Sequence, residues 1–152
     1  MKGLEYARTK LDRARLRLHG TTRITRTYTI GDTPMVVEAG NPRELSRIKA
    51  YVRKEPDTVE WINSHVRPND VFYDIGANIG LTLVPIARRP SVACYGFEPE
   101  PENFALLEAN TRANVPDAEV TLFNVALSTE RAPLKFELNE KNRAIIGFGA
   151  KP

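Results

Sequence analysis

The ten residues 71–80, VFYDIGANIG, constrain the fold more than any other part of the chain. Four of the first five are apolar residues that favour β structure, as expected for a strand buried on both faces of a sheet. The composition then changes abruptly to Gly, Ala and Asn. Gly76 and Gly80 would let the backbone turn and a ligand approach the main chain, and a helix expected to begin near Gly80 would direct unpaired N–H groups to the same place. This segment predicts a strand that leads into a nucleoside-binding turn.

The residues of this turn restrict the chemistry of the ligand. A dinucleotide-binding turn reads G-x-G-x-x-G, but Asn78 and Leu81 stand at the second and third glycine positions. A carboxylate at the strand end, Asp74, would repel a diphosphate and attract an ammonium or sulfonium group. The turn therefore favours a positively charged nucleoside.

A second acidic residue, Glu98, follows the next apolar segment, VACYGF at residues 92–97. An acidic side chain at the tip of the second strand of a βαβ unit is placed to accept hydrogen bonds from both ribose hydroxyls. We therefore predict Glu98 as the ribose ligand. The predicted binding set also includes Ala77 and Asn78 in the turn and Pro99 after Glu98.

Three motifs in order carry a family resemblance: DIGANIG, then GFEPEPENF with LLEAN behind it, then FNVALS. Over roughly residues 57–140 the chain resembles the FkbM family of S-adenosylmethionine-dependent methyltransferases. The resemblance implies an α/β, Rossmann-like class I methyltransferase fold, S-adenosyl-L-methionine as the cofactor, and a hydroxyl of a small molecule or sugar as the methyl acceptor. It also implies that Asn124, Val125 and Ala126 line the adenine side of the cofactor. No catalytic base and no metal ligand is assigned.

The periodicity of apolar residues predicts the remaining elements. An N-terminal region, residues 1–54, is expected to precede a methyltransferase domain at residues 55–152. The N-terminal region comprises a basic amphipathic helix, a small β-hairpin and a further helix, at residues 4–18, 23–38 and 43–52. The domain then contributes helices at residues 57–66, 81–89 and 101–113, and strands at residues 119–127 and 134–138.

The three parallel strands of this plan form only part of a doubly wound sheet. The resemblance implies a fourth strand beside residues 71–75 that brings a further acidic motif, and no such strand is found before Pro152. The catalytic domain is therefore expected to be incomplete, and turnover by this chain alone to be low or nil. The strand at residues 71–75 would then lie at an open sheet edge. Self-association or a partner chain is expected there.

Composition fits a globular protein, with 41% apolar and 27% charged residues in 152. No apolar stretch is long enough to span a membrane and no export signal is seen, so a cytoplasmic location is predicted. The one cysteine, Cys94, is expected to be a buried, inert thiol. Residues 1–27 hold eight Lys and Arg against two acidic residues. Contact with an anionic membrane is left open for this basic segment, while few aromatic residues accompany the arginines and no specific nucleic-acid partner is expected.

Besides a membrane-surface protein that uses the basic N-terminal segment, two alternatives to a methyltransferase stay open. The chain could be a non-catalytic remnant that binds a partner through its open sheet edge. It could also be a nucleotide-dependent oxidoreductase, which Asn78 disfavours because a glycine is needed there for the pyrophosphate.

Overall fold

A computed structural model describes residues 23–30, 33–40, 44–45, 48, 50–51 and 56–129. The predicted basic helix at residues 4–18 and the strand at residues 134–138 lie outside the described residues. Of the helix expected at residues 43–52, the described residues are helical.

The centre of the fold is a parallel sheet of three strands, β3 (Val71–Ile75), β4 (Ala93–Phe97) and β5 (Val120–Phe123), in the order β3-β4-β5. Helix α4 (Leu83–Ala87) connects the first two strands, and helix α5 (Pro101–Asn114) connects the second and third. This alternation confirms the predicted α/β class, with part of a doubly wound parallel sheet.

Helix α4 begins at Leu83, two residues later than predicted, and the Gly80 carbonyl accepts the Val84 N–H at 3.0 Å. Pro85 is its third residue, and the N–H groups of a helix's first turn have no partner within the helix. The missing N–H of Pro85 therefore breaks no hydrogen bond, and the helix is shortened rather than kinked. Helix α5 agrees with its prediction and has Pro101 in its first turn.

Strand β5 is shorter than the predicted residues 119–127 and ends at Phe123. The last main-chain bond of its ladder joins the Glu98 N–H to the Phe123 carbonyl at 3.0 Å. Pro99 follows Glu98 in the segment that pairs with β5, and a proline has no N–H to donate. Pairing stops there, so Asn124 and the residues after it form a loop at the strand end.

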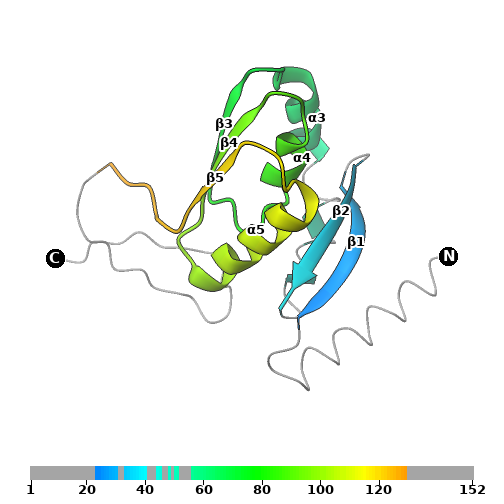
Figure 1. Cartoon of the computed structure of the whole chain (residues 1–152), viewed down its shortest axis with the longest axis vertical. Helices are drawn as coiled ribbons and strands as arrows, with labels where there is room; N and C mark the ends of the chain where they lie inside the picture. Colours follow the sequence, from blue (N-terminus) through cyan, green and yellow to red (C-terminus); the bar gives the residue numbers. More distant parts are fainter. Residues whose placement is uncertain are drawn as a thin grey trace.

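The two faces of the sheet differ. Cys94 and Gly96 point toward the helices and are buried. On the opposite face Val71, Tyr73 and Ile75 are 56%, 59% and 68% exposed. The expectation that this strand is buried on both faces is therefore wrong for the described structure, because α4 and α5 both cover the same side of the sheet (Figure 1).

Aromatic rings cover part of the exposed face. Tyr73 stacks on Tyr95 with ring centroids 5.1 Å apart, and Phe97 stacks on Phe123 at 4.9 Å. These pairs join all three strands, and they leave an apolar surface beside the edge strand β3.

The predicted hairpin is confirmed as the antiparallel strands β1 (Ile24–Ile30) and β2 (Thr33–Ala39). Alternate residues of β2, namely Met35, Val37 and Ala39, are fully buried. Helices α4 and α5 lie between this hairpin and the parallel sheet (Figure 1). The buried residues of the hairpin and of the sheet belong to one hydrophobic core. The division into residues 1–54 and 55–152 stays a prediction.

Helix α3 (Pro56–His65) leads into β3 through a short connection. Its Ile62 is buried, whereas Trp61 is 51% exposed and stacks on His65 with ring centroids 4.9 Å apart. The amphipathic pattern thus fixes α3 to the core by one face and leaves an aromatic pair on the other.

Candidate functional site

The loop between β3 and α4 follows a path that ordinary residues rarely adopt. The φ angles of Gly76, Asn78 and Gly80 are +82°, +52° and +88°. The N–H groups of Gly76 and Ala77 both donate to the Phe97 carbonyl, at 2.9 and 3.0 Å. The loop therefore turns across the carboxyl end of β4, where ligands bind in open parallel sheets.

The two glycines serve different purposes. A Cβ placed on Gly80 would lie 2.9 Å from Leu107 Cδ1 of α5, so the absence of a side chain there is needed for packing. A Cβ placed on Gly76 would meet no atom within 4 Å. The main chain is therefore open to a ligand at Gly76, whereas Gly80 faces the helix behind the loop.

Glu98 is predicted as the ribose ligand, and the structure places it directly against this loop. The residue is 3% exposed. Its Oε2 accepts the Asn78 N–H at 2.9 Å, and its Oε1 accepts the Glu100 N–H at 2.9 Å. A carboxylate oxygen has two lone pairs, so each oxygen can accept one further hydrogen bond. Glu98 thus holds the loop and keeps the capacity to bind hydroxyls.

Asp74 lies at the end of β3, close enough to Glu98 for the two charges to repel. Burial first, and then the Glu98 charge, raise the pKa of Asp74 from 3.8 to about 6, while the backbone N–H of Leu83 lowers it. Asp74 Oδ2 is buried and has no hydrogen-bond partner among the described residues. The two predicted acidic ligands therefore share one region, and one of their oxygens lacks the positive or donor group that would stabilise it.

Cys94 lies on the helix-facing side of β4 and is buried. Burial and the nearby Asp74 charge raise the pKa of its thiol to about 11. Because the thiolate is the reactive form, this agrees with the prediction of an inert thiol.

The other predicted residues lie around Glu98. Asn124 donates from Nδ2 to the Glu98 carbonyl at 2.8 Å, which brings the start of the loop after β5 to the tip of β4. Val125 is 46% exposed and Ala126 is partly buried. Pro99 follows Glu98 and is also partly buried. Roles of these residues toward adenine stay predictions.

Two polar residues of this region are absent from the predicted set. Glu100 is 3% exposed, and its Oε2 accepts the Asn103 N–H at 2.6 Å, which caps helix α5. A signal for this cap was present, because an acidic residue directly precedes the helix-starting Pro101. Asn110 is 1% exposed and donates to the loop carbonyl of Ile79 at 2.8 Å. Helical periodicity alone gives no signal for that contact.

Comparisons with known proteins show what the chain is similar to. No known protein-family profile matches the chain. Over 85 residues the chain is 48% identical to the 31-O-demethyl-FK506 methyltransferase FkbM of Streptomyces tacrolimicus. The chain is similar to an FkbM methyltransferase. The resemblance inferred from the three motifs is thereby confirmed. The match covers 53% of this chain and 30% of FkbM, so the chain spans less than a third of that protein's length.

Two solved structures also align with this FkbM-like chain. The structure of P. horikoshii TYW2 in complex with MeSAdo has a TM-score of 0.46 and 19% identity, and the alignment covers 67% of this chain and 36% of TYW2. A second Pyrococcus horikoshii protein, PH0793, has a TM-score of 0.46 and 15% identity, with 83% of this chain and 50% of that protein covered.

Two further features concern metal binding and membrane insertion in the described part of the FkbM-like chain. No cluster of three or more His, Cys, Asp and Glu residues there has an arrangement that could hold a metal ion. No helix within residues 23–129 that the structure describes has both the length and the hydrophobicity to cross a membrane.

Proposed function

We propose that this chain binds S-adenosyl-L-methionine and acts in an FkbM-like methyltransferase that methylates a hydroxyl oxygen of a small molecule or sugar. The observation that carries this proposal is the buried Asp74 Oδ2, which has no partner among the described residues and lies near the Glu98 carboxylate. A cationic ligand group would favour the ionised carboxylate and so offset the effects of burial and of Glu98 on the pKa of Asp74, whereas a diphosphate would add a third negative group. The same argument disfavours a nucleotide-dependent oxidoreductase.

The residues fit such a cofactor by their chemistry. When bound, S-adenosylmethionine supplies an electrophilic methyl group on a sulfonium. Asp74 would attract the positively charged methionine end, Gly76 would leave the main chain open to it, and Glu98 would accept hydrogen bonds from the ribose hydroxyls. Methyl transfer depends chiefly on positioning of two bound reactants. No described residue is assigned as a base for the acceptor, and we propose that turnover by the chain alone is low or nil.

Binding of S-adenosylhomocysteine tests this function without requiring turnover. Isothermal titration calorimetry should detect binding at pH 7.5, and Glu98→Ala should abolish it. Because the Asp74 pKa is about 6, only about a tenth of the carboxyl is ionised at pH 5. The wild-type affinity should therefore fall roughly tenfold between pH 7.5 and pH 5, if the ligand's ammonium group requires ionised Asp74.

Asp74→Asn is the control for this pH dependence. Its affinity should be low and nearly constant between pH 5 and pH 7.5, because the amide does not titrate. Folded wild-type protein that gives no heat with S-adenosylhomocysteine would contradict the proposed function and favour a non-catalytic partner-binding protein. A pH dependence that persists in Asp74→Asn would assign the titration to another group.

We also propose that the chain self-associates through β3 and the exposed face beside it. No other described strand pairs with the outer edge of β3, and Ile75 is 68% exposed there. Ile75→Lys should lower the fraction of dimer in sedimentation velocity, because a charge on this apolar face would have to be desolvated on association. Trp61→Lys on α3 is the matched control, since Trp61 is 51% exposed but lies on a different element. Equal dimer fractions in the wild type and Ile75→Lys would contradict the proposal.

Two predictions concern the location of the protein. Contact of the basic residues 1–27 with anionic membranes is retained as a proposal, and salt-dependent binding to anionic vesicles would test it. The cytoplasmic compartment likewise stays a prediction.

A further inference from the structure

Asn110 is a polar residue in the buried interior of helix α5. It is 1% exposed, in a helix that runs from Pro101 to Asn114. Asparagine stabilises a helix less than alanine does, and burying its amide is unfavourable unless both ends are hydrogen-bonded. A residue with these two disadvantages at a core position requires specific partners.

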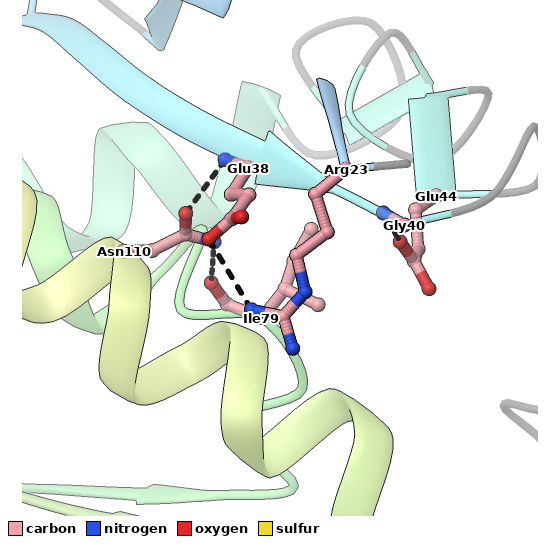
Figure 2. Close-up of polar contacts among 6 residues, drawn as sticks. All are labelled: Arg23, Glu38, Gly40, Glu44, Ile79 and Asn110. Atoms are coloured by element: carbon pink, nitrogen blue, oxygen red, sulfur yellow. Dashed lines mark hydrogen bonds and ion pairs between the residues drawn. The ribbon is translucent and has the colours of Figure 1, made fainter. Parts of the chain in front are cut away.

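The Asn110 side chain lies between the loop and the hairpin (Figure 2). Its Nδ2 donates to the Ile79 carbonyl at 2.8 Å, and its Oδ1 accepts the Glu38 N–H of β2 at 2.7 Å. The chemistry of the two partners fixes the orientation of the amide, because a carbonyl needs a donor and an N–H needs an acceptor. One side chain thus joins two segments that are far apart in the sequence.

Ile79 lies between two other fixed points of the loop. The preceding residue, Asn78, donates its N–H to Glu98 at 2.9 Å. The following residue, Gly80, packs so closely on Leu107 of α5 that a Cβ would overlap it. Contacts therefore hold three consecutive loop residues. Two of these contacts come from Leu107 and Asn110, which lie one turn apart on α5.

We propose that Asn110 is a positioning residue for the cofactor-binding loop. By fixing the Ile79 carbonyl it holds the left-handed backbone at Asn78, so that the Asn78 N–H stays on Glu98 and Glu98 stays oriented toward the ribose. The Glu38 N–H fixes the other end of the Asn110 amide and so keeps its Nδ2 directed at the Ile79 carbonyl. The nature of the ligand in this inference rests on the proposed function, but the support of the loop does not.

Asn114, one turn further along α5, provides a matched control. Its Oδ1 accepts the Val36 N–H at 2.8 Å, and its Nδ2 donates to the Val36 carbonyl at 2.6 Å. Like Asn110, it therefore attaches helix α5 to strand β2 through an asparagine side chain. None of the hydrogen bonds of its amide is to the loop. Substituting it should weaken the hairpin contact without releasing Ile79.

The test compares Asn110→Ala, Asn110→Asp and Asn114→Ala. The aspartate keeps an acceptor for the Glu38 N–H but replaces the donor that faces the Ile79 carbonyl with an oxygen. Affinity for S-adenosylhomocysteine is measured by calorimetry on folded protein, and hydrogen exchange is measured at the Asn78 and Gly80 amides. Both Asn110 variants should bind about tenfold more weakly or worse and exchange these amides faster. Asn114→Ala should keep wild-type affinity and exchange, whatever its loss of thermal stability.

The outcomes separate this inference from the proposed function. If the wild type does not bind S-adenosylhomocysteine, the proposed function fails, and amide exchange still tests the support of the loop. Equal affinity and equal exchange in the Asn110 and Asn114 variants would overturn the inference alone. If neither Asn110 variant folds, amide exchange of the wild type is the test. Exchange at Asn78 that is rapid compared with the core amides of α5 would overturn the inference. Slow exchange at Asn78 would support it.

Discussion

Replacing Asp74 with Asn should stabilise the folded protein by about 2 to 3 kcal/mol at pH 8, although it impairs ligand binding. The physical reason is that burial and the Glu98 charge disfavour the ionised carboxylate and raise its pKa to about 6. The amide of Asn is similar in shape and neutral, and its oxygen can still accept the Leu83 N–H. Most substitutions at structural residues destabilise, so a stabilising change marks a residue kept for binding.

The pH dependence follows from the sign of this shift. Between pH 3.8, the ordinary pKa, and about 6, the folded protein binds more protons at Asp74 than the unfolded chain does. The Asp74 contribution to wild-type stability therefore falls as pH rises through this window and stays low above it. Urea unfolding of the wild type and Asp74→Asn at pH 4 and pH 8 measures the difference in their free energies of unfolding. Relative to the wild type, Asp74→Asn should have a clearly higher free energy of unfolding at pH 8 and a nearly equal one at pH 4. A variant less stable than the wild type at pH 8 would contradict the prediction.

Replacing Gly80 with Ala should destabilise the protein by about 2 to 4 kcal/mol, whereas Gly76→Ala should cost about 1 to 2 kcal/mol. Both glycines have positive φ angles, +88° and +82°, so both substitutions introduce backbone strain. Only at Gly80 would the new Cβ also overlap another atom, Leu107 Cδ1 at 2.9 Å. The difference between the two variants therefore isolates the packing of the loop on α5.

Chemical denaturation of the two glycine variants measures this difference directly. Calorimetry adds a second comparison, because Gly76 faces open space and Gly80 faces the helix. Gly76→Ala should cause a small loss of stability but a larger loss of affinity for S-adenosylhomocysteine. Equal destabilisation by the two substitutions would show that Leu107 moves aside readily and that the close contact has little energetic effect.

The sequence predicted the parts of the fold that depend on local patterns. The apolar run ending at Asp74, the loop glycines and the acidic tip at Glu98 indicated two neighbouring parallel strands and a shared site at their carboxyl ends. The alternation in β1 and β2 indicated the hairpin. Pro101 placed the start of α5. Each of these depends on residue types within a few positions of one another, so no knowledge of distant contacts was needed.

The errors have a different origin. The strand at residues 119–127 was predicted too long because its apolar residues continue past Phe123, while pairing ends where β4 meets Pro99. The strand β3 was expected to be buried on both faces because its composition is that of a buried strand. Its exposure depends on which side the helices occupy, and a run of apolar residues does not contain that information.

The amino-acid sequence by itself therefore indicated the ligand chemistry that we propose for the site, because a carboxylate at a strand end and an acidic tip on the next strand are local features. Only the tertiary structure decided what holds that site in place. Asn110 meets Ile79, 31 residues away, and Glu38, 72 residues away. Whether a buried amide is tolerated depends on partners brought to it by folding, so its role becomes visible only when the distant chain segments are packed together.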